Sequence, residues 1–272
     1  MCPVCDLRPK LACVKAPPYS AASIPVLRLP GSRSEHDAVA VEEPLEIRVN
    51  GAPFAVTMRT PGHDEELALG FLVSEGIRPI RAAVPDDLAA NTVEVEAESF
   101  DPRRLERHFY TSSSCGVCGK GALEAVAVEA PAVAGDLRVS ASLVAELPNR
   151  LRAHQPAFEE TGGLHATGLF DRSGELLCLH EDVGRHNAMD KVVGRAFLDG
   201  RLPLADSILC VSGRLSFELV QKAAVAGCPI VVAVGAPSSL AVELGGDRGV
   251  TLCGFVRGGR VNVYTHEWRI AS

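Results

Sequence analysis

Alternating apolar and polar residues mark the strands predicted in the first half of the chain. Residues 45–49 alternate and lead into Asn50-Gly51, the dipeptide most typical of a two-residue hairpin turn, after which residues 54–58 form the returning strand. Residues 91–98 alternate in the same way. Between these strands an acidic run follows Pro61-Gly62 and opens a predicted helix, with its carboxylates near the positive end of the helix dipole.

Short apolar runs alternate with helical patterns in the second half of the chain. The predicted strands are 164–170, 175–180, 207–211 and 230–234, the predicted helices are 142–154, 187–198, 216–226 and 238–244, and a hairpin closes the chain at 250–265. Uninterrupted apolar strands alternating with helices are typical of a sheet covered on both faces. We therefore expect an α/β fold, specifically a three-layer sandwich, with a smaller N-terminal α+β part.

The first 35 residues follow neither pattern. They are rich in Pro, Ser and small residues, which predicts an irregular leader. Cys2 and Cys5 lie there with the spacing of half a zinc site, but no second half is close in the sequence. We expect three parts: a leader over 1–35, an α+β region over 36–135 that carries a Cys-x-x-Cys loop, and an α/β domain over 136–272.

Charge and composition narrow the classes of partner. The chain of 272 residues carries a formal net charge of -7, which argues against a nucleic-acid binder that relies on overall charge. No run approaches the roughly 18–20 apolar residues that a transmembrane helix needs, and the N-terminus lacks the apolar core of a secretory signal. We expect a cytoplasmic protein that uses neither a membrane nor nucleic acid.

The cysteines that follow the leader divide into two groups. Four of the nine cysteines lie in or beside apolar runs and are expected to be buried small hydrophobic residues, namely Cys178, Cys210, Cys228 and Cys253. Cys115 and Cys118 instead lie in a loop of Ser and Gly residues, followed by Lys120. Closely spaced thiols on such a loop are typical of metal ligands or reactive nucleophiles, and the pattern alone does not decide between these roles or exclude a loop without function.

A zinc deaminase is one interpretation of this loop. His63-x-Glu65 followed by Cys115-x-x-Cys118 imitates the deaminase signature, in which the Glu shuttles protons. Ser114 stands where that signature has Pro, and His63 belongs to a run that equally suits a solvated helix start. We therefore assign no residue as a metal ligand.

Three loops in the second half have residues suited to anions. The first contains Arg185 and His186 at a strand-to-helix junction, the second is Ser212-Gly213-Arg214 after a strand, and the third is the segment from Phe255 to Arg260. Strand ends of open α/β sheets bind ligands, and guanidinium groups beside glycines suit phosphates. Each loop taken alone also fits a helix cap or a hairpin turn, but together they predict a large phosphorylated ligand.

These segments together resemble the formate dehydrogenase accessory sulfurtransferase family, FdhD. The matching segments are Cys115–Gly119, Thr161–Ala166, Glu181–Lys191, Ser212–Val220, Ala236–Val242 and Gly254–Arg257. The resemblance implies a core similar to the cytidine deaminase fold. It also implies transfer of persulfide sulfur from a cysteine desulfurase to the molybdenum bis(molybdopterin guanine dinucleotide) cofactor of formate dehydrogenase.

The resemblance also implies roles for individual residues. Cys115 matches the persulfide-bearing cysteine, and Cys118 matches the second cysteine of the loop. The segment that matches the guanine dinucleotide site is Phe255, Val256, Arg257, Gly258, Gly259 and Arg260. A homodimer would suit a cofactor with two guanine arms, and a non-catalytic cofactor chaperone is the alternative function.

Overall fold

A mixed six-stranded sheet forms the centre of the computed structural model, which describes residues 20–85, 91–98, 128 and 131–272. In spatial order its strands are β13 (Arg260–Val263), β12 (Thr251–Arg257), β11 (Ile230–Ala233), β10 (Ser207–Val211), β8 (His165–Asp171) and β9 (Leu176–Asp182). Strands β10, β11 and β12 are parallel, and the other neighbouring pairs are antiparallel.

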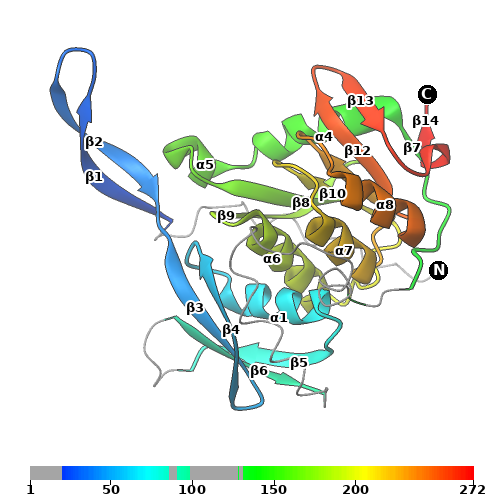
Figure 1. Cartoon of the computed structure of the whole chain (residues 1–272), viewed down its shortest axis with the longest axis horizontal. Coiled ribbons are helices and arrows are strands. Elements are labelled where there is room, and N and C mark those ends of the chain that lie inside the picture. Colours follow the sequence, from blue (N-terminus) through cyan, green and yellow to red (C-terminus); the bar gives the residue numbers. More distant parts are fainter. Residues whose placement is uncertain (1–19, 86–90, 99–127, 129–130) are drawn as a thin grey trace, which may run out of the picture.

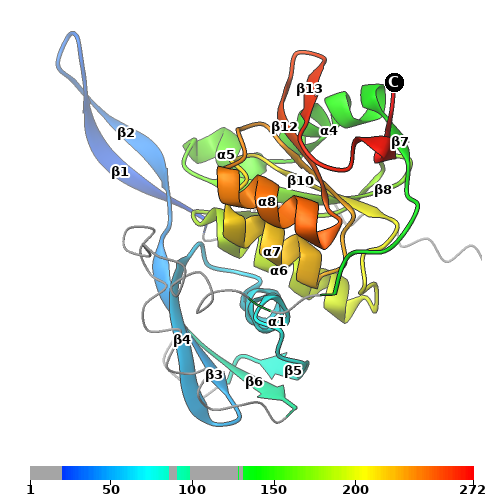
Figure 2. The ribbon, with the colours of Figure 1, turned by 45° about the vertical axis from the view of Figure 1, so that its right-hand side comes forward.

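Helices cover both faces of this sheet (Figures 1 and 2). One face carries α6 (Arg185–Leu198), α7 (Phe217–Val225) and α8 (Ser239–Arg248), and the opposite face carries α4 (Ala141–Arg152). A separate apolar core fills each interface, with Met189, Leu219 and Ala241 on the first face and Leu147 and Phe170 on the second. The predicted α/β class is therefore confirmed.

A smaller sheet and one helix form the N-terminal part. The sheet contains, in spatial order, β4 (Ala52–Arg59), β3 (Glu43–Val49), β6 (Thr92–Ala97) and β5 (Pro79–Ala83). Helix α1 (Asp64–Ser74) lies between this sheet and α6 (Figure 2). It buries Leu67, Leu69 and Leu72 against the strands. Because α1 is covered on two sides, its sequence is apolar on more than one face.

Two glycines allow α1 and α6 to approach closely. A Cβ at Gly70 of α1 would collide with the carbonyl of Asp190 in α6, and a Cβ at Gly194 would collide with the carbonyl of Glu66 in α1. Backbone therefore lies against backbone at this crossing, which any side chain would force apart.

Most of the predicted elements are present. The Asn50-Gly51 turn has φ values of 51° and 83°, as a type I′ hairpin requires. The helix predicted over 142–154 is α4, and Ser140 caps it: the Ser140 hydroxyl accepts a hydrogen bond from the Leu143 N–H at 3.1 Å. Cys210, Cys228 and Cys253 are buried as expected, and Cys178 is half-buried. No described helix has the length and apolar character to span a bilayer.

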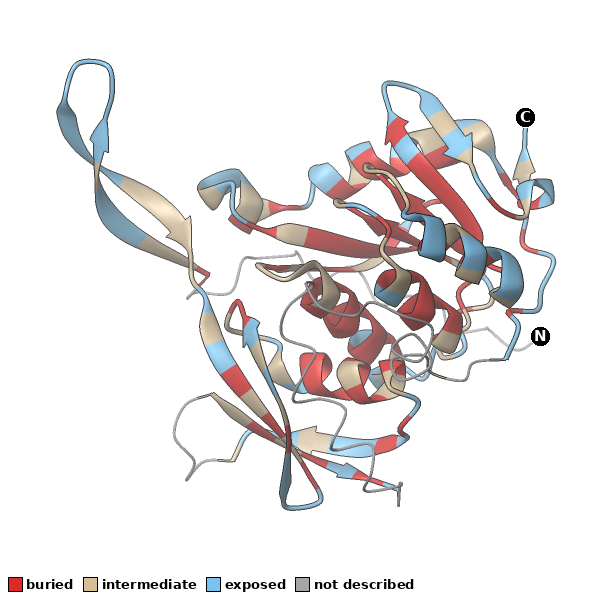
Figure 3. Cartoon of the chain, viewed as in Figure 1, coloured by how far each residue is buried: buried red, intermediate tan, exposed pale blue. Residues whose placement is uncertain are grey.

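The predicted irregular leader is wrong for residues 21–35. Strands β1 (Ala21–Arg28) and β2 (Arg33–Ala40) pair antiparallel from Ala21↔Ala40 to Arg28↔Arg33. This hairpin projects from the body and is largely exposed (Figure 3). A strand pair without a buried face needs no regular apolar alternation, so its sequence lacks the signal used for the other strands.

The sequence pattern also missed the shorter elements. They are β5, α5 (Pro156–Thr161), β7 (Val139–Ser140), a 3₁₀ turn η2 (Glu267–Arg269) and β14 (Ile270–Ala271), which pairs with β7. Elements of this length offer too few residues to show a period. The domain boundary near residue 136 stays a prediction.

The glycine contact between α1 and α6 gives a stability prediction. Gly70→Ala should lower the free energy of unfolding by about 3 kcal/mol or more, because the added methyl group must displace backbone. Gly246→Ala is the matched control: this exposed glycine lies in α8 with no described atom within 4 Å of an added Cβ. The control should be neutral or stabilise by up to about 1 kcal/mol. Urea denaturation followed by circular dichroism measures both, and equal stabilities would contradict the packing described.

Candidate functional site

Sheet topology brings several polar segments to one edge. Because β8 runs antiparallel to β10, and β9 antiparallel to β8, the end of β10 lies beside the start of β8 and the end of β9. Ser212 follows β10, and its hydroxyl accepts a hydrogen bond from the Ala166 N–H at 2.9 Å. Its own N–H donates to the Ala166 carbonyl at 2.9 Å. The loop after β10 is thereby fixed to the start of β8.

The Ser212-Gly213-Arg214 loop packs against the loop that follows β11. The Gly235 N–H donates to the Gly213 carbonyl at 3.0 Å. A Cβ at Gly235 would lie 3.0 Å from both that carbonyl and Cγ of Arg214, and one at Gly213 would lie 3.5 Å from Nδ1 of His165. A side chain at Gly235 would therefore crowd the neighbouring loop, whereas one at Gly213 would make an ordinary van der Waals contact with the imidazole. Arg214 itself is exposed at this edge.

Arg185 and His186 open α6 at the same edge. The Arg185 Nε is buried and has no hydrogen-bond partner among the described residues. The His186 Nε2 lies 3.3 Å from the Ser216 hydroxyl and 3.8 Å from the Glu218 carboxylate. Burial, together with the cations Lys222 and Arg185, lowers the pKa of His186 to about 4, so this imidazole is neutral at neutral pH.

A buried ion pair holds the start of α6 in place. The Lys191 Nζ lies 2.7 Å from Oδ2 of Asp182, and both side chains are almost fully buried. The other carboxylate oxygen of Asp182 accepts from the Gly184 N–H at 2.8 Å. Lys191 also donates to the Thr60 carbonyl at 2.8 Å. The residues that precede Arg185 are therefore tied both to α6 and to the end of β4.

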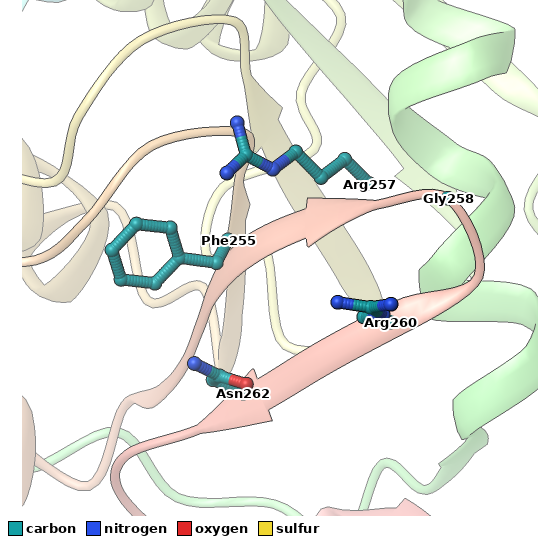
Figure 4. A pocket seen from close by; sticks show the side chains of 5 residues that line it. All are labelled: Phe255, Arg257, Gly258, Arg260 and Asn262. Carbon is teal, nitrogen blue, oxygen red and sulfur yellow. The ribbon is translucent and has the colours of Figure 1, made fainter.

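The hairpin between β12 and β13 carries an open pocket of about 410 Å³. Its lining residues are Phe255, Arg257, Gly258, Arg260 and Asn262, whose side chains extend from both strands (Figure 4). The Phe255 N–H donates to the Gly235 carbonyl at 3.0 Å, which joins the hairpin to the loop edge described above. Phe255 is 40% exposed with a φ of 52°, so an apolar ring and two guanidinium groups face solvent together.

Most of the predicted ligand-binding residues thus lie along one edge. The Ser212-Gly213-Arg214 loop meets the hairpin through Gly235. Arg185 and His186 open α6 beside that loop, where the His186 ring lies 3.3 Å from the Ser216 hydroxyl. This edge is called the basic edge below, and it comprises Arg185, His186, Ser212, Gly213, Arg214, Phe255, Arg257, Gly258, Gly259, Arg260 and Asn262. Open hairpin positions with adjacent guanidinium groups can bind phosphates, and an exposed ring can stack on a base.

One predicted residue has a buried side chain, and two residues at this edge were not predicted. The Val256 side chain is fully buried in the core that faces α4, so Val256 could contact a ligand at the hairpin through its backbone alone. Strand alternation explains this, because Val256 points to the opposite face from Phe255 and Arg257. The same alternation could have indicated Asn262. His165, half-buried beside Gly213, belongs to the Thr161–Ala166 segment of the family resemblance but was given no role there.

Cys115 and Cys118 lie outside the described residues. The chain is next placed at Val128, whose N–H donates to the Gln221 side chain of α7 at 2.9 Å. In the deaminase-like segment His63-x-Glu65, His63 contacts Glu66 at 2.7 Å, while Glu65 is exposed. The helical phase of α1 turns Glu66 inward and Glu65 outward.

Fold and basic edge together define a mixed α/β protein with a candidate anion site at the ends of its parallel strands. The model of the FdhD/NarQ family matches residues 40–271. The chain belongs to this family.

Curated relatives agree with this membership. Proteins named sulfur carrier protein FdhD are 51% identical in Streptomyces avermitilis, 49% in Mycobacterium tuberculosis and 46% in Sulfolobus acidocaldarius. These comparisons cover 86%, 86% and 87% of this chain and 89%, 92% and 92% of the respective relatives. A crystal structure of a protein assigned as a formate dehydrogenase accessory protein, from Desulfotalea psychrophila, superposes with a TM-score of 0.71 at 29% identity. That match covers 92% of this chain and 98% of the other.

Proposed function

We propose that this protein is a sulfurtransferase that supports formate dehydrogenase activity. It accepts persulfide sulfur from a cysteine desulfurase on Cys115 and passes it to the molybdenum bis(molybdopterin guanine dinucleotide) cofactor. Family membership and the names of the curated relatives support a sulfur-carrying role. The position of Cys115 in a loop of small residues supports its assignment as the acceptor thiol.

The sulfur chemistry proceeds by thiolate exchange. The Cys115 thiolate attacks the terminal sulfur of the desulfurase persulfide, and the desulfurase cysteine leaves as a thiolate. Cys115 then carries the persulfide. Attack of the Cys118 thiolate on the inner sulfur releases hydrosulfide to the acceptor and leaves a Cys115–Cys118 disulfide. A cellular dithiol must reduce this disulfide before the next cycle.

The basic edge is the proposed site for the cofactor cargo. The observation that carries this part of the proposal is the buried Arg185 Nε, which has no partner in the described chain and lies in the first turn of α6. A buried donor without a partner costs free energy unless a ligand satisfies it, and a helix N-terminus favours an anion. Ser212 and Gly213 lie in the loop after β10, at the same edge of the sheet. Arg257 and Arg260 would bind phosphate, and Phe255 would stack on guanine.

The remaining parts of the proposal concern partners and setting. The partners would be a cysteine desulfurase and a formate dehydrogenase, and the protein would act in the cytoplasm. A homodimer would offer one basic edge to each guanine arm of the cofactor. Likeness of the sheet and its helices to the cytidine deaminase fold stays a prediction. The alternative is a chaperone that binds the cofactor without transferring sulfur.

Substitution of the acceptor thiol separates sulfurtransferase from chaperone. In cells lacking the native protein, Cys115→Ala should reduce formate dehydrogenase activity to the level of the deletion strain, because no persulfide forms. Cys13→Ala, which removes a thiol of the N-terminal region, should restore full activity. Formate oxidation in cell extracts measures both. Full activity with Cys115→Ala would reject sulfur transfer through this residue and favour the chaperone.

Removal of both hairpin guanidinium groups tests the cofactor site. Arg257→Ala/Arg260→Ala should weaken binding of guanosine diphosphate by about tenfold to 100-fold, since two charge-assisted hydrogen bonds are lost. Arg33→Ala/Arg172→Ala removes two exposed arginines elsewhere and should leave affinity unchanged. Isothermal titration calorimetry gives the dissociation constants. Equal affinity of the hairpin variant and the wild-type protein would remove the hairpin from the proposed site, and persulfide loading of Cys115 should be normal in either case.

A further inference from the structure

Three metal-ligating side chains converge away from the basic edge. Oε2 of Glu66, in the first turn of α1, lies 2.7 Å from Nδ1 of His63 and 3.2 Å from Nε2 of His180. The two imidazole rings have their centroids 4.4 Å apart. His63 precedes α1, whereas His180 lies on β9, so the cluster joins the N-terminal part to the six-stranded sheet.

Two of these atoms are buried without satisfactory hydrogen bonds. His180 is 8% exposed and Glu66 is 9% exposed. Neither the His180 Nε2 nor the Glu66 Oε2 makes a hydrogen bond of acceptable geometry within the described residues, although the atoms are close to each other. Their close approach without hydrogen-bond alignment is the arrangement expected when both atoms face a common third partner.

The surroundings favour a cation as that partner. An imidazole nitrogen and a carboxylate oxygen are both common ligands of metal cations, and here both lie buried within reach of one ion. Arg195 lies 3.6 Å from Oε1, the other carboxylate oxygen of Glu66. Oε2 is the oxygen that lies near the two histidines.

The donor set is that of a zinc site. Two imidazole nitrogens and one carboxylate oxygen, all within 4.8 Å of one another, suit Zn²⁺, which takes His and Glu ligands at about 2.0–2.2 Å in tetrahedral geometry. Three protein ligands leave a fourth position for water. Arg195 beside Oε1 resembles the outer partners that orient ligating carboxylates. Calcium and magnesium prefer sites built from oxygen alone.

We propose that His63, Glu66 and His180 bind one Zn²⁺ ion. The ion would connect the start of α1 to β9 and hold these elements together where the N-terminal part meets the six-stranded sheet. Asp182, two residues beyond His180 on β9, belongs to the ion pair that positions α6. This inference does not depend on the proposed sulfur transfer, and either can fail without the other.

Thiol ligands must be removed before zinc binding can be assigned. The full-length chain is therefore prepared with serine at the cysteines of the N-terminal region and the loop, that is with Cys2→Ser, Cys5→Ser, Cys13→Ser, Cys115→Ser and Cys118→Ser. Titration with Zn²⁺ against a chromophoric chelator should give one site per chain. Replacement by Co²⁺ should produce visible d–d bands without thiolate charge transfer. Absence of a site in this background would overturn the proposal.

Two ligand variants in the same background complete the test. His63→Asn keeps a residue that tolerates the left-handed backbone observed at His63, with a φ of 59°, and His180→Gln keeps a polar side chain in the buried position. Each should weaken zinc binding by about 100-fold. His36→Asn, at an exposed histidine on β2, should bind as the parent does. Because His63 is exposed, its variant should fold even if the His180 variant does not. Unchanged affinity of His63→Asn would overturn the assignment.

Discussion

The crossing of α1 and α6 is the constraint on which the rest of the structure depends. Gly70 and Gly194 let the two backbones touch, so the smaller sheet can cover α1 while α6 covers the larger sheet. Beside this crossing, the buried Asp190 of α6 accepts hydrogen bonds from Lys222 of α7 and Ser74 of α1, both at 2.8 Å. Three helices are therefore fixed by one carboxylate, and a shift in any of them would leave a buried charge without its partners.

A second buried pair, Asp182 and Lys191, connects this region to the basic edge. Asp182 and Lys191 bind each other and the backbone around Thr60, which connects β4 to α1. Breaking such a pair from one side typically costs about 3–5 kcal/mol, because the remaining charge is uncompensated. The first turn of α6 thus has a defined position, and Arg185 is presented at the basic edge by the packing of elements far from it in the sequence.

The sequence predicts the second half of the fold well and the first half less well. Strand β10 begins and ends where its apolar run does, and the hairpin of β12 and β13 follows from Arg257-Gly258-Gly259-Arg260. In contrast, the exposed hairpin of β1 and β2 has no buried face and hence no apolar pattern. Local signals suffice where one face of each strand or helix is buried and turns are marked by glycine.

The candidate sites show the same difference between local and tertiary information. The arginines and glycines of the basic edge are visible in the sequence because each loop has its own motif. The contact between His63, Glu66 and His180 is not, since it depends on the phase of α1 and on β9 lying beside it. His180 also stands in an apolar strand, where a single histidine is usually a core residue. Only the packing of the two parts brings these side chains together.

Mass spectrometry of the acceptor peptide tests the central claim most directly. The purified protein is incubated with a cysteine desulfurase and cysteine, digested without reductant, and compared with a sample treated with a mild reductant. The proposed function predicts a gain of one or more sulfur atoms on the peptide that contains Cys115, and loss of that gain after reduction. A peptide of unchanged mass, from a desulfurase shown to be active in the same reaction, would contradict the assignment of this protein as a sulfur carrier through Cys115.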